Sequence, residues 1–197
     1  MPAKGKPQFN ALTIKYNGLA KRIVTEVGLT PAFDPFQYRD KKPPYQIINK
    51  QTLWDTGATN SVLTPETVRE LKLIPVGITD VIHFGGTKQS NTYLVNFFFP
   101  ENVMIYGVLV SESENIIGDF GAIIGMDIIT KGDFSITNVN NLTWMSYRIP
   151  SIQTIDYVVE ANRIIYAGID KYGPCPCGKR DEKGSPVKFK FCHGKDL

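Results

Sequence analysis

The chain has 197 residues, of which 42% are hydrophobic and 21% charged, and its formal net charge at pH 7 is +3. This length suits one ordinary domain with a small appendage, and the hydrophobic fraction argues against wholesale disorder. The small basic excess is scattered toward the two ends, whereas nucleic-acid binding needs a dense basic face, so no specific nucleic-acid partner is expected.

The N-terminal stretch MPAKGKPQFN has no apolar run, and no later segment reaches the length that crosses a bilayer. We therefore expect no membrane partner. The chain has three cysteines, all within its last 23 residues. An odd, clustered set without an export signal argues against a disulfide framework and predicts a reducing, cytoplasmic location.

The first elements along the chain are predicted to be β-strands. Residues 9–29 contain two β-branched and apolar runs around Asn17-Gly18, which is a strong hairpin signal. Residues 33–44 carry three prolines and five charges and are predicted to form a loop. Residues 45–54 read as a strand that ends directly before Asp55.

The next predicted elements are one short helix and then several strands. A helix is predicted over 64–73, with Thr64 as its N-cap and Pro65 at its first position. Glycines at Gly85-Gly86 tip a hairpin that is a candidate mobile flap. The strand segments that follow the helix are 76–84, 91–99, 104–112 and a hairpin over 133–150, and residues 122–129 form an apolar run broken by one glycine.

The composition and hydrophobic pattern of the sequence change after residue 151. The segment from 151 to about 169 fits either a helix or a docking strand, and the tail from Lys171 is rich in Gly, Pro, Lys and Cys. We therefore predict a main domain over 1–165 and a small module over 166–197.

Asp55 follows two large apolar residues, Leu53 and Trp54, and opens the tripeptide Asp-Thr-Gly. One interpretation is purely structural: the carboxylate accepts hydrogen bonds from nearby backbone amides in a turn before the helix. The other is a positioned catalytic acid, and the tripeptide alone does not separate the two.

The wider context resembles the retropepsin-type aspartic peptidases. The stretch LWDTGATNSVL, a Gly-tipped hairpin about 30 residues later, and AIIGMDII follow that family's order and spacing over roughly residues 10 to 150. The resemblance implies a mainly β fold, namely a closed barrel with a flap hairpin and one or two short helices. It also implies an aspartic endopeptidase whose site residues are Asp55, Thr56 and Gly57 (catalytic) and Ala58, Gly85, Gly86 and Thr87 (substrate-binding).

Amide hydrolysis by such an enzyme needs two carboxylates that share one proton. The chain contains one Asp-Thr-Gly, so the resemblance implies a homodimer in which each copy contributes Asp55, acting on an extended polypeptide. Asp127 is the internal alternative, although it is expected to cap a short helix. After Ile129 the chain departs from the retroviral pattern, which leaves the dimer interface without a template.

Cys175, Cys177, Cys192 and His193 form two close pairs separated by 14 residues. Four such ligands suit a closed, structural tetrahedral Zn²⁺ site whose metal would supply folding free energy. The segment resembles the SEC-C zinc motif, in which Cys-Pro-Cys-Gly is followed by Gly-Ser, a basic-aromatic stretch and Cys-His. The resemblance implies a docking module for a protein or ribosome partner.

Two other functions remain open from the sequence. The same cleft would serve a non-hydrolytic peptide-binding module, with the zinc tail as a docking element. A metal-dependent hydrolase at the Cys/His cluster is a weaker alternative, because four protein ligands leave no open coordination position. The sequence does not name the substrate or the cleavage-site preference.

Overall fold

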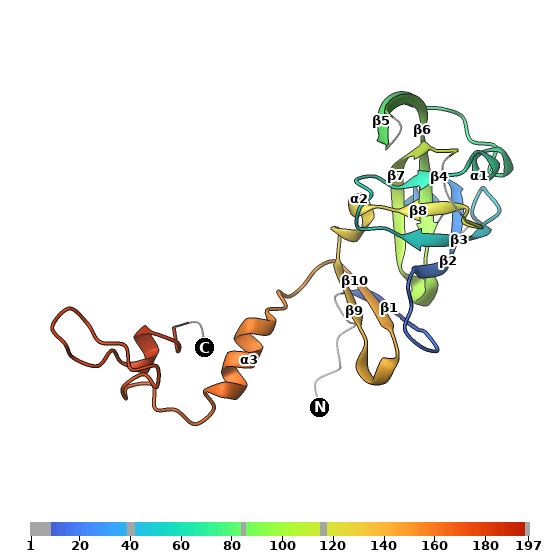
Figure 1. Cartoon of the computed structure of the whole chain (residues 1–197). Helices are drawn as coiled ribbons and strands as arrows, with labels where there is room; N and C mark the ends of the chain where they lie inside the picture. Colours follow the sequence, from blue (N-terminus) through green and yellow to red (C-terminus); the bar gives the residue numbers. More distant parts are fainter. Residues whose placement is uncertain (1–8, 39–41, 84–85, 115–117, 196–197) are drawn as a thin grey trace. The chain divides into compact units, whose positions relative to one another are not determined.

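The computed structural model describes residues 9–38, 42–83, 86–114 and 118–195. The chain divides into two compact units, Met1–Ile152 and Gln153–Leu197 (Figure 1). The first unit is built mainly from β-strands with short helices, which confirms the predicted fold class. The second contains one helix and the cysteine-rich tail, so the segment that the sequence left undecided is grouped with the tail.

The first unit is a closed β-barrel with one hairpin extended from it. The barrel closes because β2 pairs with β6 as well as with β3. Within the described part of the chain β5 pairs with β6 alone, and the two form the predicted hairpin. In order around the ring, the strands are β2 (Ile23–Pro31), β3 (Ile48–Trp54), β8 (Ala122–Ile124), β4 (Val62–Leu63), β7 (Met104–Glu112) and β6 (Gly86–Phe98), with β5 (Gly77–His83) outside it.

A separate three-stranded sheet joins the two ends of this unit. Its order is β1 (Asn10–Lys15), β10 (Trp144–Ile149) and β9 (Asp133–Thr137), all antiparallel, which confirms the hairpin predicted over 133–150.

The predicted hairpin around Asn17-Gly18 is wrong. β1 pairs with β10 and β2 pairs with β3, so the two runs belong to different sheets. Gly18 does adopt a left-handed φ of 118°, but its carbonyl accepts a hydrogen bond from Thr143 N at 3.0 Å. The Tyr16 hydroxyl bridges the runs, donating to Val24 O (2.8 Å) and accepting from Val24 N (2.9 Å). The turn residues redirect the chain between sheets.

The helices of the first unit are short. The predicted capping of α1 is confirmed, because Thr64 Oγ1 accepts a hydrogen bond from Thr67 N at 3.2 Å and Pro65 opens the helix. The helical segments are α1 (Pro65–Glu70), α2 (Met126–Ile129), and the 3₁₀ turns η1 (Pro35–Tyr38), η2 (Pro100–Asn102) and η3 (Val139–Asn141).

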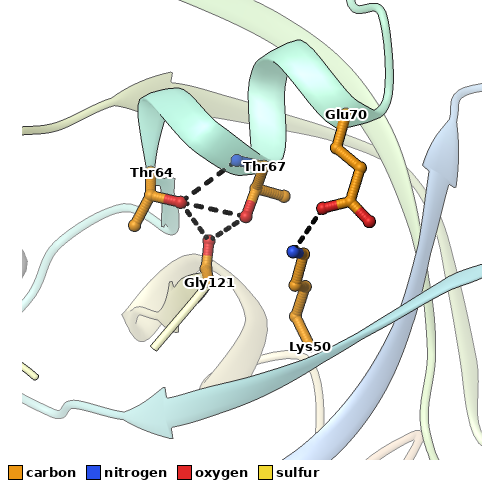
Figure 2. Close-up of polar contacts among 5 residues, drawn as sticks. All are labelled: Lys50, Thr64, Thr67, Glu70 and Gly121. Atoms are coloured by element: carbon orange, nitrogen blue, oxygen red, sulfur yellow. Dashed lines mark hydrogen bonds and ion pairs between the residues drawn. The ribbon is translucent and has the colours of Figure 1, made fainter. Parts of the chain in front are cut away.

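The N-terminus of α1 holds the chain directly before β8. Figure 2 shows the carbonyl of Gly121 beside the two threonine hydroxyls: it accepts from Thr67 Oγ1 at 2.9 Å and from Thr64 Oγ1 at 3.3 Å. Lys50 on β3 forms an ion pair with Glu70 at the other end of α1. These contacts fix α1, β3 and the start of β8 relative to one another, and both strands lead into the candidate site.

The core lies inside the barrel and between it and the second sheet. Trp54 is buried, whereas its neighbour Leu53 is half-buried. The indole stacks on Phe134 with ring centroids 5.3 Å apart, and its Nε1 donates to Thr25 Oγ1 at 2.9 Å. Trp54, the residue immediately before Asp55, is therefore fixed by both packing and a hydrogen bond, so the backbone that carries Asp55 is held rigidly.

The second unit begins its regular structure with α3 (Tyr157–Ile165), whose N-cap Asp156 accepts hydrogen bonds from Val158 N and Val159 N. The tail beyond α3 consists of turns, two isolated β-bridges and η4 (Phe189–Phe191). Among the described residues, no helix combines the length and the apolar character needed to span a membrane.

Candidate functional site

Asp55 stands on a tight turn at the end of β3. Its backbone N–H donates to Ile124 O at 2.9 Å, which continues the pairing of β3 with β8 by one residue. The side chain then folds back, and Asp55 Oδ1 accepts a hydrogen bond from Gly57 N at 2.8 Å. A Cβ added at Gly57 would lie 3.2 Å from that oxygen, so a glycine at this position avoids a tight contact with the carboxylate. The turn fixes the orientation of the acid through backbone atoms.

The start of α2 holds the same turn from the other side. Met126 N donates to Ala58 O at 2.8 Å, and Asp127 N donates to Thr59 O at 3.1 Å. At Gly125 the two segments approach so closely that an added Cβ would lie 2.6 Å from the carbonyl carbon of Asn60. Only glycine permits this approach, which gives a physical reason for the apolar-apolar-Gly pattern noted in the sequence.

A buried serine joins the two segments. Ser61 is fully buried, and its Oγ accepts from Gly125 N at 3.0 Å and donates to Asp127 Oδ1 at 2.7 Å. Asp127 was expected to cap α2, but the N-cap is Gly125 and Asp127 lies in the first turn. The expectation is corrected: the Asp127 side chain is directed to Ser61 and helps to fix the Asp55 loop against α2.

Sequence reasoning did not single out Ser61. In TGATNSVL the serine reads as one more small polar residue of a loop. A possible signal was its place directly before the apolar pair Val62-Leu63, since a polar residue that enters a buried strand must find a partner. Its partner is 66 positions away, so the sequence alone did not identify it.

A cavity of about 620 Å³ lies beside the turn. One wall is the Asp55 loop, represented by Gly57 and Ala58, and another is β5, represented by Thr79 and Val81. Aliphatic side chains of β4 and β7 form a third part of the lining, and they include Val62, Val108 and Val110. The cavity thus brings together the predicted catalytic loop and the predicted flap hairpin, and it combines an apolar surface with polar groups, as ligand sites do.

The other residues predicted for the site lie either beside Asp55 or near the tip of the β5–β6 hairpin. Thr56, next to Asp55, is exposed. Gly86 (φ 118°) and Thr87 are at the tip end of the hairpin, opposite His83 and Ile82 respectively, and neither lines the described part of the cavity. Gly85 lies outside the described residues.

The second candidate site is the Cys/His cluster of the tail. The ligand atoms of Cys175, Cys177, Cys192 and His193 all lie within 4.8 Å of one another. Cys177 Sγ lies 3.4 Å from Cys175 Sγ and 3.6 Å from Cys192 Sγ. His193 Nδ1 lies 3.2 Å from Cys175 Sγ and 3.5 Å from Cys192 Sγ. A tetrahedron with metal–sulfur bonds of about 2.3 Å has edges of roughly 3.5–3.8 Å, so these residues could hold a metal ion.

The acidities of the thiols fit the same interpretation. Burial raises the pKa of Cys175, but hydrogen bonds from the Cys177 N–H and from His193 outweigh it and hold the pKa at about 6. Burial and the neighbouring thiols raise the pKa of Cys192. Three thiolates in contact repel one another, and a bound cation removes that repulsion, which couples metal binding to deprotonation.

The chain is similar to solved structures of other proteins. Neither the protein-family models nor the curated proteins include a match. Solved structures similar to it include a retropepsin-like aspartic protease from Rickettsia conorii, at 9% identity and a TM-score of 0.45, which covers 74% of this chain and 98% of that one. The EIAV protease is 26% identical with a TM-score of 0.37, covering 58% of this chain and 89% of that one. The retroviral protease-like domain of Ddi1 from Leishmania major is 14% identical with a TM-score of 0.33, covering 68% and 97% respectively.

Proposed function

We propose that this chain is an aspartic endopeptidase that works as a homodimer, in which the Asp55 carboxylates of two copies activate one water molecule. The observation that carries the proposal is the construction of the Asp55 turn. A carboxylate stands at the end of β3, directly after the buried Trp54, is oriented by the Gly57 amide at 2.8 Å, and adjoins a cavity of about 620 Å³ that the hairpin also lines.

Each residue of the turn has a distinct role in this proposal. One Asp55 accepts a proton from water while the other, protonated, donates to the carbonyl oxygen of the scissile amide. Because two carboxylates in contact cannot both ionise cheaply, the pair would titrate as a unit. Gly57 and Ala58 are small where a substrate backbone must pass, and exposed Thr56 is available to hydrogen-bond to the equivalent loop of the second copy.

The substrate would be an extended polypeptide lying between the Asp55 turn and the β5–β6 hairpin. Main-chain hydrogen bonds would supply much of the affinity, and the cavity would receive a side chain. Its aliphatic lining, from residues such as Val62, Val81 and Val108, favours an apolar side chain at that position. Gly86, with its left-handed φ of 118°, lets the hairpin reverse direction next to its tip.

We further propose that the tail binds one structural Zn²⁺ through Cys175, Cys177, Cys192 and His193. A full set of four protein ligands leaves no position for a substrate, so the ion would stabilise the fold of the tail. The same unit exposes Tyr172 and Phe191, with Lys190 Nζ lying 4.4 Å and 4.7 Å from the two ring centroids. Such a mixed aromatic and basic surface suits recruitment of a protein partner or a ribosome.

The test is cleavage of a peptide library by purified, zinc-loaded protein, read by mass spectrometry. Asp55→Asn should abolish cleavage and leave the thermal unfolding curve intact. Asp127→Asn is the matched control: it alters a second carboxylate close to the Asp55 loop, one that lines the cavity, and an amide oxygen can still accept from Ser61. It should retain cleavage.

Two results would contradict the proposal. Equal loss of cleavage in both variants would point to an intramolecular pair of Asp55 and Asp127. Binding of peptides by wild type with no cleavage, even at concentrations where the chain is dimeric, would instead identify a peptide-binding module.

A further inference from the structure

Helix α3 carries an apolar stripe that has no role in the site or in the metal cluster. Its large members are strongly exposed: Tyr157 65%, Val158 69%, Ile164 73% and Ile165 67%. With Ala161, these residues occupy one arc of about 120° on a helix of 3.6 residues per turn. An exposed stripe of this kind marks a surface that another element covers.

The opposite side of the helix is already occupied. Val159, Asn162 and Tyr166 are half-buried, and the Tyr166 ring packs on Phe189 and His193 with centroids 5.2 Å and 5.3 Å away. The tail therefore holds α3 by one side and leaves the stripe outward within its own unit. The charged residues Glu160 and Arg163 lie outside the stripe, so the stripe itself is uncharged.

The stripe is symmetric about its central residue. Val158 and Tyr157 lie three and four residues before Ala161, and Ile164 and Ile165 lie three and four residues after it. A twofold axis through Ala161, perpendicular to the helix, would place Val158 of one copy against Ile164 of another, and Tyr157 against Ile165. An isologous contact requires this kind of self-complementary pattern, and a small residue at its centre allows two helices to approach closely.

We propose that the stripe Tyr157, Val158, Ala161, Ile164 and Ile165 is a homodimerisation surface, which pairs antiparallel with the same stripe of a second copy of this chain. The contact would be modest in area. Residues 151–156 between β10 and α3 are neither helix nor strand, so a helix pair would tether two β-barrel units. A tether of this length raises the effective concentration of one unit near the other to the order of millimolar.

This inference goes beyond the proposed function, since pairing of α3 does not depend on catalysis by Asp55. If both hold, the pairing explains how two copies of a single acid meet without a dedicated strand interface. The experiment therefore measures mass and geometry, with cleavage left aside, and includes Asp55→Asn, which should dimerise as wild type does.

The first arm is sedimentation velocity of the full, zinc-loaded chain over a concentration series. Ile164→Glu should weaken dimerisation by about a factor of ten or more, because a carboxylate would be buried in an apolar contact. Arg163→Glu, a neighbouring exposed position off the stripe, should leave the dissociation constant within about twofold. Far-UV circular dichroism verifies that both variants keep the helix.

The second arm tests the antiparallel register by disulfide crosslinking. Ala161→Cys should crosslink to itself across the axis. Tyr157→Cys should fail to crosslink to itself, because the two positions would be about 12 Å apart along the helices, yet should crosslink to Ile165→Cys in a mixture of the two variants. Wild-type chain supplies the background from the three native cysteines.

Several outcomes would overturn the proposal. The wild type could be monomeric, with its stripe protected from hydrogen exchange by its own β-barrel unit. Ile164→Glu could dimerise normally, or Arg163→Glu could weaken dimerisation equally. Position 157 could crosslink to itself while position 161 does not.

Discussion

The Asp55 loop and the Cys/His cluster are both compact arrangements of reactive side chains, but different forces hold them. Asp55 rests on a barrel whose inward-facing side chains, such as Trp54 and Ile124, are buried, and the turn is fixed by backbone hydrogen bonds to β8 and α2. The tail offers two buried hydrophobic side chains, Cys175 and Phe189, among the described residues. The Asp55 loop is therefore supported by a hydrophobic core, whereas the Cys/His cluster lies in a segment that has little core of its own.

The two regions differ in where their folding free energy would come from. A barrel of this size can bury enough apolar surface to offset its conformational entropy, whereas a tail of turns and isolated bridges cannot. A metal ion at four ligands would supply the missing free energy. The two sites should therefore respond to different perturbations, and each can be disturbed without the other.

The largest expected effect is that of removing the proposed metal ion. Chelation, or Cys175→Ser, should unfold the tail, since structural zinc sites contribute on the order of 10–16 kcal/mol of apparent binding free energy. Both tryptophans, Trp54 and Trp144, lie in the β-rich unit, so the tryptophan fluorescence transition should stay unchanged while the NMR amide dispersion of the tail collapses. A fluorescence transition that shifts equally would show that the two units fold as one.

The next effect should come from Gly125→Ala. Gly125 has an ordinary φ of −95°, so the cost is steric: the new methyl would lie 2.6 Å from the backbone of Asn60. We expect a loss of about 3 kcal/mol or more in the free energy of unfolding, measured by tryptophan fluorescence in denaturant.

Gly77→Ala, at the start of β5 in the same unit, is the matched control, because its methyl would meet the end of a side chain, the Thr92 hydroxyl at 3.1 Å, which can shift where backbone cannot. It should change stability by less than about 1 kcal/mol. If Gly125→Ala is equally mild, the close approach of α2 to the Asp55 turn is not a constraint.

Ser61→Ala should have a smaller effect on the same region. It leaves Gly125 N and Asp127 Oδ1 without their buried partner, at a cost of about 1–3 kcal/mol. A double-mutant cycle with Asp127→Ala, followed by urea unfolding, should give a coupling energy clearly different from zero. Strict additivity would mean that the two side chains do not act together.

The smallest effect concerns pH. Asp133 accepts hydrogen bonds from Ser151 Oγ and Ile152 N and pairs with Arg148, and these contacts lower its pKa from 3.8 to about 2. Because the folded pKa is depressed, the stabilisation is full above about pH 4 and is lost as the pH falls toward 2. The wild-type minus Asp133→Asn difference in unfolding free energy should shrink across that window, and a flat difference would contradict the assignment.

Local signals in the sequence predicted much of the barrel. The capping of α1 by Thr64, the strand that ends at Asp55, the β5–β6 hairpin and the β9–β10 hairpin all depend on residues close together in the chain. The failure at Asn17-Gly18 has the opposite cause. That dipeptide favours a reversal, but the partner of β1 is β10, more than 120 residues later, and pairing with it buries Leu12 with Met145 and Tyr147.

The sequence by itself determined which reactive groups are present: one Asp-Thr-Gly after an apolar pair, four soft or borderline ligands in two pairs, and most of the strands between them. Only the tertiary structure decided how these groups are held, through Ser61 with Asp127, Gly125 against Asn60, and the tail-facing side of α3. The physical reason is that propensities and caps act over a few residues, whereas buried polar groups and close-packed glycines are satisfied by partners that the chain brings together only when it folds.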